Sequence, residues 1–412
     1  MTQPVVIVNP TSSGSELAPA FAKRNVSAVA VRLAGSGGQG NGGFANKIQA
    51  ENFLDVLQEQ ADLVETLAKL KPHAIIAGTE SGVPLADHLA AMLTPKFANV
   101  HALSQARVHK ALMQEALEKA GMPVIRTLNA ASVVEAEAWL KKHQLMNAPL
   151  VVKPPESAGS DKVFLIPAGG DWKTPFEHIL ATPAAVLSRL NKTVIVQEQA
   201  LGTEYAVDTV SAAGKHTLAH FMRYEKAEVS GGQKIFDFTE FLPVDTKEHR
   251  DLIKYAEDAL DALGIHWGAA HCEIMLTQNG PRLIEVGSRM CGGPVLGFAR
   301  AATGSSQVER VVEAYVDGKI STQNYKLNQT VVPVFLAAPV TGVLRNVEVL
   351  DQLKKLPTHL ATHMWLKNGD RVKRTVDFGT TIGIVALAGK RDAVFSDYRR
   401  VREVEAQMVI DE

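Results

Sequence analysis

His271-Cys-Glu-Ile-Met-Leu276 and Arg282-Leu-Ile-Glu-Val-Gly-Ser-Arg289 are two apolar stretches, each interrupted by one carboxylate. Gly280-Pro281 lies between them and is typical of a turn, so the two stretches predict a β-hairpin. A carboxylate on an apolar strand must be paired or must bind a cation, because burying an isolated charge is costly. Mg²⁺ prefers carboxylate, water and phosphate oxygens, so Glu273 and Glu285 are candidate metal ligands.

The alternative for these two glutamates is a structural salt bridge to Arg282 or Arg289. Arg289 is also a candidate catalytic and substrate-binding residue, since a forked guanidinium suits an acyl phosphate and the oxyanion formed when an amine attacks it. Gly292 and Gly293 follow closely and would let a ligand approach the backbone, so they are candidate substrate contacts. His271 would either orient a substrate carboxylate or be a hydrogen-bonded core histidine.

A lysine at a strand end introduces a second candidate site. Val-Val-Lys-Pro-Pro-Glu-Ser-Ala-Gly-Ser at 151–160 places Lys153 before a loop of small residues. Backbone N–H groups and hydroxyls of such a loop can bind phosphate oxygens, while the lysine supplies a positive charge. The candidate phosphate-binding residues of the loop are Ser157, Gly159 and Ser160. The alternative is a surface turn with a solvated lysine.

A third stretch, Gln-Glu-Gln-Ala-Leu-Gly-Thr-Glu at 197–204, has a carboxylate near each end. In a nucleotide site such a stretch can contact the adenine edge through its backbone, and a later carboxylate can accept both ribose hydroxyls. The candidate residues are Gln197, Glu198, Ala200 and Glu204. Taken alone, the stretch also fits exposed acidic residues on a hairpin, because charged side chains mostly lie outside.

Hydrophobic periodicity divides the chain into three parts. Residues 1–103 alternate short strands and helices, including a helical pattern around 53–70, and predict an α/β domain with a parallel sheet. Residues 104–330 begin with a helix from Ser104 to Ala120 and continue as α+β, with a lid subdomain at about 132–202. Residues 331–412 are β-rich, with a strand predicted at 372–376, and should form a small C-terminal domain.

Composition excludes several classes of function. The 412 residues include 43 Lys and Arg against 44 Asp and Glu. The chain therefore has no excess of positive charge that would attract nucleic acid or an anionic membrane. Only Cys272 and Cys291 are present, and both are expected to be small apolar residues rather than disulfide partners or nucleophiles. No signal region or membrane span is apparent, so a cytoplasmic protein is expected.

The order of these elements resembles the ATP-grasp superfamily over roughly 99–318. More narrowly, Gly78-Thr-Glu-Ser-Gly-Val-Pro-Leu-Ala-Asp87, Glu204-Tyr-Ala-Val-Asp208 and Glu285-Val-Gly-Ser-Arg289 look like the L-amino-acid ligases that make dipeptides. The resemblance implies an ATP-grasp fold with an N-terminal Rossmann-like α/β domain, a central domain with a mobile lid, and a small β-rich C-terminal domain. It further implies ATP and Mg²⁺ as cofactors, two amino acids as substrates, an acyl phosphate intermediate, and a homodimer.

Carried over by position, the resemblance implies Lys110 and Lys153 on the ATP phosphates, with the loop 157–160 as a flexible lid over them. It implies residues 197–200 at the adenine, Glu204 at the ribose, and Glu273 and Glu285 on Mg²⁺. The superfamily often has a metal-binding Asn two residues after the second glutamate, where this chain has Gly287.

Three other functions remain as alternatives. Gly-Ser-Gly-Gly-Gln-Gly at 35–40 matches the glycine pattern of nicotinamide-dependent oxidoreductases, but it follows the second predicted strand and leaves the glutamates and Arg289 unexplained. A nucleotide-binding protein without turnover is a second alternative. A ligase that joins a modified or non-amino-acid carboxylate to an amino acid is the third.

Overall fold

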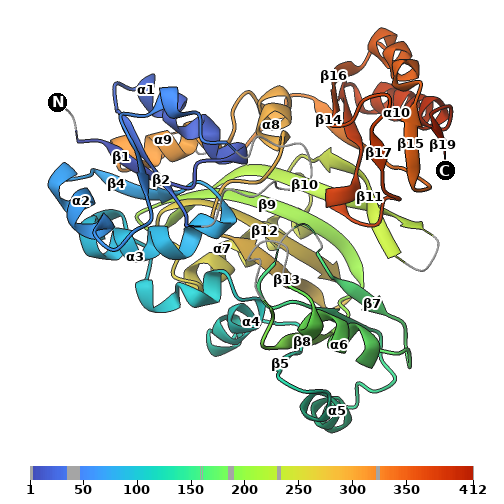
Figure 1. Cartoon of the computed structure of the whole chain (residues 1–412), viewed down its shortest axis with the longest axis horizontal. Coiled ribbons are helices and arrows are strands. Elements are labelled where there is room, and N and C mark those ends of the chain that lie inside the picture. The colour runs from blue at the N-terminus through green and yellow to red at the C-terminus, as the bar shows by residue number, and fades with distance from the viewer. Residues whose placement is uncertain are drawn as a thin grey trace.

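The computed structural model describes residues 3–34, 47–157, 159, 161–183, 190–229, 233–321 and 325–411. The first part is a parallel sheet in the order β3-β2-β1-β4, formed by Val56–Gln58, Ala28–Arg32, Val5–Val8 and Ala74–Ala77. Helices α1 (Leu17–Ala22), α2 (Leu63–Leu70) and α3 (Val83–Leu93) belong to the same part (Figure 1). The parallel sheet predicted from the alternating pattern is therefore confirmed.

Two predicted helices differ from the structure. The pattern around 53–70 divides into β3 and α2, because residues 56–58 pair with β2. The helix predicted from Ser104 begins later, as α4 (Lys110–Lys119), after 3-10 turns at His101–Leu103 and Gln105–Arg107. The Ser104 hydroxyl does not cap that helix, because it donates to Asp87 Oδ2 at 2.8 Å.

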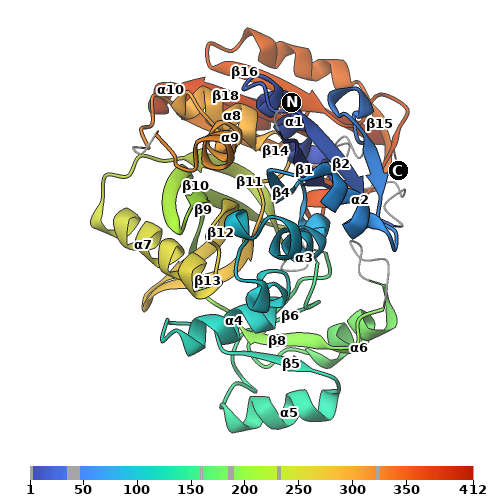
Figure 2. The same ribbon diagram turned by 90° about the vertical axis from the view of Figure 1, so that its left-hand side faces the viewer.

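A four-stranded antiparallel sheet follows α4, in the order β5-β8-β6-β7. Its strands are Thr127–Ala130, Val194–Glu198, Leu150–Lys153 and Phe164–Ile166. Helices α5 (Val133–Lys142) and α6 (Lys173–Ala181) pack on it around Leu140, Phe176 and Val196, and Figure 2 shows this unit below the rest of the molecule. Because this sheet has its own apolar core, it can support β6 and β8 as one rigid unit.

The long central sheet has eight strands in the order β13-β12-β9-β10-β11-β14-β18-β16. They are Gly280–Gly287, Gly268–Thr277, Gly202–Ala212, Lys215–Val229, Gln233–Phe241, Thr330–Leu336, Gly383–Gly389 and His359–Met364. The predicted hairpin is confirmed as β12 and β13, with Glu273 opposite Glu285 in the register. Helices α7 (Lys247–Ala262), α8 (Val295–Thr303) and α9 (Gln307–Asp317) connect and cover these strands.

The C-terminal strands β14, β18 and β16 continue the central sheet from β11. The rest of this part is α10 (Arg391–Glu405) and a small sheet of β15 (Gly342–Arg345), β17 (Arg371–Val372) and β19 (Val409–Asp411). The strand predicted at 372–376 is thus shorter, since the backbone N–H groups of Val376 and Asp377 donate to Thr380 Oγ1 in a turn instead.

The domain boundaries at 103 and 330, and the lid at about 132–202, stay predictions. Among the described helices, none is long and apolar enough to cross a membrane.

Candidate active site

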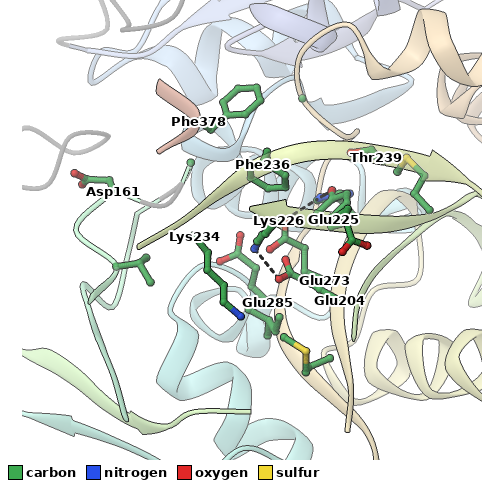
Figure 3. A pocket seen from close by; sticks show the side chains of 18 of the residues that line it. Asp161, Glu204, Glu225, Lys226, Lys234, Phe236, Thr239, Glu273, Glu285 and Phe378 are labelled. Carbon is green, nitrogen blue, oxygen red and sulfur yellow. Dashed lines mark hydrogen bonds and ion pairs between the residues drawn. The ribbon is translucent and has the colours of Figure 1, made fainter. Parts of the chain in front are cut away.

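A cavity of about 930 Å³ lies where the central sheet faces the small sheet of β5 to β8. Figure 3 shows Glu204, Lys226, Glu273 and Glu285 converging in it. Of the candidate residues from the sequence, those that line this cavity are Lys110, Lys153, Ser157, Gly159, Gln197, Ala200, Glu204, His271, Glu273, Glu285, Arg289, Gly292 and Gly293. The structure therefore brings residues more than 180 positions apart into one site. Ser160 and the glycine stretch 35–43 lie outside the described residues.

The acidic pair lies on neighbouring strands within this cavity. The β12–β13 register puts Glu273 directly opposite Glu285, so two carboxylates share one patch. Lys110 Nζ lies 2.8 Å from Glu285 Oε2 and also donates to the Ser157 carbonyl at 2.6 Å. Burial alone would lower the pKa of Lys110, but Glu285 raises it, so the lysine stays charged. Two adjacent carboxylates that face a cavity fit the oxygen ligands that Mg²⁺ takes, and they are the residues that would hold it.

The salt bridges proposed as the alternative for this pair are not those that form. Arg282 donates to the carbonyls of Asn279 and Pro281, while Arg289 Nε lies 2.9 Å from Glu80 Oε2. Among the described residues, neither arginine makes an ion pair with Glu273 or Glu285. The acidic pair therefore faces the cavity with a lysine and a histidine as its partners.

A buried network fixes His271. Its Nδ1 lies 2.5 Å from Asp208 Oδ1, and its Nε2 lies 3.3 Å from Glu273 Oε1 and 3.3 Å from the Tyr224 hydroxyl. Burial alone would lower the pKa of His271, but the Asp208 carboxylate raises it to about 10. Asp208 also contacts His220 Nδ1 at 3.0 Å. His271 is thus a hydrogen-bonded imidazolium at the cavity wall, and its contact with a substrate stays a prediction.

Glu204 forms a second charged contact in the cavity. Its Oε2 lies 2.6 Å from Lys226 Nζ, which also lies 4.9 Å from the centre of the Phe236 ring (Figure 3). Burial raises the pKa of Glu204 although Lys226 opposes the shift. Lys226 lies on β10, where the pairing with β11 shifts register between Glu225 and Lys226, and both residues line the cavity. The carboxylate predicted at the ribose therefore has a lysine partner that sequence patterns did not indicate.

The side chain of Glu198 lies outside the cavity, so any contact of this residue with the adenine would be made by its backbone, and that contact stays a prediction. Glu198 Oε2 lies 2.7 Å from Arg126 Nε, and both side chains are substantially exposed outside the cavity. Successive side chains of a strand point to opposite faces, so Gln197 faces inward, where it donates to Thr127 Oγ1, and Glu198 faces outward. The Glu198 side chain is therefore not a cavity residue.

The two cysteines are both buried, as the sequence predicted. Burial raises the pKa of both thiols well above its usual value, so neither is a thiolate at neutral pH. Cys291 lines the cavity and Cys272 packs in the core of the central sheet.

An apolar wall closes the side of the cavity toward the C-terminal strands. Ring centres of Tyr224 and Phe236 are 5.2 Å apart, those of Phe236 and Phe335 are 5.3 Å apart, and those of Phe335 and Phe378 are 5.9 Å apart. The wall is completed by Phe241, Val295, Phe298, Pro333, Val376 and Ile384. Because Tyr224 also contacts His271, the apolar wall begins beside the charged part of the site.

Lys153 gives a testable pH dependence. The lysine is 4% exposed at the end of β6, and burial together with nearby Lys110 lowers its pKa to about 8. ATP phosphates favour the charged lysine, so ATP affinity should be constant below pH 8 and should fall as pH rises further, by at most about tenfold per pH unit. Calorimetric titration with Mg²⁺ and ATP from pH 7.5 to 9.5 measures this. Lys153→Arg, which stays charged, should remove the dependence, and a flat profile for the unchanged protein would contradict it.

Two stretches of the chain match known family models. Residues 146–296 match the ATP-grasp domain, and residues 334–394 match the L-amino acid ligase C-terminal domain 2. The first stretch runs from just before β6 to the start of α8 and contains Lys153, Glu204, both metal-ligand candidates and Arg289. The matched domain thus coincides with most of the cavity.

The whole chain is also similar to known proteins. It is 28% identical over 420 aligned residues to dapdiamide A synthase of Enterobacter agglomerans, which covers 98% of this chain and 96% of that protein. Its structure is similar to that of an L-amino acid ligase from Bacillus licheniformis, with a TM-score of 0.72, 16% identity, and coverage of 99% and 98%. It is also similar to an ATP complex of a carboxyaminoimidazole ribonucleotide synthase from Aspergillus clavatus, with a TM-score of 0.70, 15% identity, and coverage of 98% and 99%. These similarities confirm the α/β and α+β ATP-grasp fold expected from the sequence.

Proposed function

Because this chain is an ATP-grasp carboxylate-amine ligase that resembles the L-amino acid ligases, we propose that it joins two amino acids by an amide bond. ATP would be cleaved to ADP and phosphate through an acyl phosphate. One observation carries the proposal: Lys110, Lys153 and Arg289 share a single cavity with the acidic pair on β12 and β13. This is the charge pattern needed to bind a triphosphate with its cation and a reacting carboxylate together.

The proposed reaction has two steps. A carboxylate oxygen of the first amino acid attacks the γ-phosphorus of ATP, forming an acyl phosphate while the bond to the β-phosphate oxygen breaks and ADP leaves. The amine of the second amino acid then attacks the acyl carbon, loses a proton, and expels inorganic phosphate.

The chain's own residues would act by holding charge in place. Lys110 and Lys153 would neutralise the phosphates, and Arg289 would face the acyl phosphate and the oxyanion that forms on amine attack. Glu273 and Glu285 would hold Mg²⁺, which when bound supplies charge neutralisation between the phosphates. Glu204 would accept hydrogen bonds from the ribose hydroxyls after its ion pair with Lys226 opens.

The apolar wall favours substrates in which at least one of the two amino acids has an apolar side chain. Phe335 is 7% exposed and Ile384 is 2% exposed, so a charged side chain against them would lose its hydration without a partner. An apolar side chain would instead gain from burial, at about 25 cal/mol per Å² of apolar surface.

A screen of substrates tests the proposal. ADP release should require ATP, Mg²⁺ and a pair of amino acids, one of them Leu, Ile, Val, Met or Phe, and mass spectrometry should find the dipeptide. Phe335→Ala should lower kcat/KM for the apolar amino acid by about tenfold while KM for ATP stays within about twofold. Tenfold corresponds to about 1.4 kcal/mol, the contribution of roughly 55 Å² of apolar contact between the ring and the substrate at about 25 cal/mol per Å². Absence of pair-dependent ADP release would reject dipeptide synthesis.

A second candidate function is favoured by the similarity to dapdiamide A synthase. In that case a modified or non-amino-acid carboxylate would be activated and an amino acid would be the acceptor. ADP release that depends on one amino acid and a supplied carboxylic acid that is not an amino acid, with no dipeptide, would support it. A cytoplasmic homodimer stays a prediction, and sedimentation of the purified protein would test its oligomeric part.

A further inference from the structure

The motif at 78–87 has no role in the function proposed above, yet it brings one side chain against a residue that lines the cavity. Glu80 lies in a 3-10 turn, Glu80–Gly82, between β4 and α3 of the N-terminal sheet. Its Oε2 lies 2.9 Å from Nε of Arg289. Arg289 comes just after β13 and is more than 200 positions away in the sequence. The N-terminal part of the chain therefore reaches the arginine that faces the cavity.

The turn that carries Glu80 is fixed against the end of β1. Gly78 N donates to the Val8 carbonyl at 2.8 Å, and Asn9 Nδ2 donates to the hydroxyls of Thr79 and Ser81, each at 3.0 Å. A β-carbon on Gly78 would lie 2.7 Å from Pro10 Cα, so a larger residue would push the turn away. The position of Glu80 is thus set by the backbone of the parallel sheet.

The guanidinium is held from two sides. Arg289 Nε faces Glu80, and Nη1 donates to the Met290 carbonyl at 3.0 Å. Its side chain is 15% exposed and that of Glu80 is 26% exposed, so the ion pair is largely shielded from water. These contacts hold Nε and Nη1, while Nη2 lies beside residue 287, where an added β-carbon would be 3.0 Å from it.

Gly287 provides the space for this pair. A β-carbon at position 287 would lie 2.9 Å from Arg289 Cζ and 2.9 Å from Glu80 Oε2, which is closer than real β-carbons approach such atoms. An Asn at this position would need the same volume. Arg289 and Glu80 therefore occupy the place that a side chain at 287 would take.

We infer that Glu80 is a positioning residue for Arg289 and that Gly287 is required because this ion pair fills its side-chain space. The inference rests on the proposed function, in which Arg289 acts on the acyl phosphate. In this arrangement the N-terminal sheet fixes the orientation of a guanidinium in the ATP-grasp site.

Kinetics of Glu80→Gln test the inference. This variant should lower kcat by about 10- to 100-fold, the range for a residue that orients an active-site group, while KM for ATP stays within about twofold. Glu80→Asp, which keeps the charge, should recover part of the loss. Gly287→Ala should also lower kcat, whereas Gly297→Ala, where an added β-carbon meets no atom within 4 Å, should not.

The double variant separates positioning from an independent role. If Glu80 acts only through Arg289, Glu80→Gln should cause no further loss in an Arg289→Ala background. Additive losses, or an unchanged kcat in Glu80→Gln, would overturn the inference.

A crystal structure of Glu80→Gln provides a test that does not depend on the reaction. The Arg289 guanidinium should move from its place beside residue 287. An unmoved guanidinium would overturn the inference even if the ligase activity is confirmed, and a displaced one would support it even if the substrates differ from those proposed.

Discussion

Glu285→Gln should lower the rate of ADP release by about 10²–10³-fold, because the variant removes one of the two negative charges proposed to hold Mg²⁺. The change keeps the shape of the side chain, and the amide oxygen can still accept a hydrogen bond from Lys110, which lies 2.8 Å from Glu285 Oε2. The fold should therefore be retained. The measurement is steady-state ADP release over a range of Mg²⁺ concentrations, with circular dichroism as the check on folding.

Glu137→Gln is the matched control for this prediction. Glu137 also has lysine partners, with Lys141 and Lys173 each 2.6 Å from a carboxylate oxygen, but it lies on α5 away from the cavity. The Glu137→Gln variant should release ADP at a rate within about twofold of the unchanged protein, because exposed ion pairs contribute little to the stability of the fold. If Glu285→Gln released ADP as fast as Glu137→Gln at saturating Mg²⁺, the assignment of Glu285 as a metal ligand would have to be withdrawn.

The parts of the fold and site that follow from local sequence were predictable. Glu273 and Glu285 were recognisable because each is a charge on an otherwise apolar strand, and the Gly-Pro turn between the strands fixes which residues face each other. Lys153 was recognisable for a similar reason, since it ends a strand before a loop of small residues.

The missed features depend on contacts between distant segments. Lys226 and Glu204 are 22 positions apart, and only the β9–β10 pairing brings them together. Glu80 lies in a motif that was noticed, but its partner Arg289 is reached only through the packing of the N-terminal sheet on the central one. Ser104 was expected to cap a helix, and its tertiary bond to Asp87 competes with that local preference. Local patterns thus predict which residues are unusual, and tertiary packing decides their partners.

Arg289→Ala should lower the rate of product formation by about 10²–10³-fold and leave KM for ATP within about threefold. The reason is that the guanidinium is assigned to the reacting acyl phosphate and oxyanion, while the nucleotide is held by Lys110, Lys153 and Glu204. A second signature should be uncoupling, with more ADP released than amide formed, because an acyl phosphate that waits for its amine can be hydrolysed. The ratio of ADP to product, measured on the same samples, reports it.

Arg289→Lys separates charge from geometry. Lysine keeps the positive charge but loses the fork that reaches Glu80 and the Met290 carbonyl together, so most of the loss should remain. Arg289→Ala also leaves Glu80 without its partner, and burial already raises the pKa of that carboxyl. Glu80→Gln in the same background removes this complication, and the loss should persist there. A variant that lost ATP affinity but still formed product in step with ADP would move Arg289 from the acyl phosphate to the nucleotide.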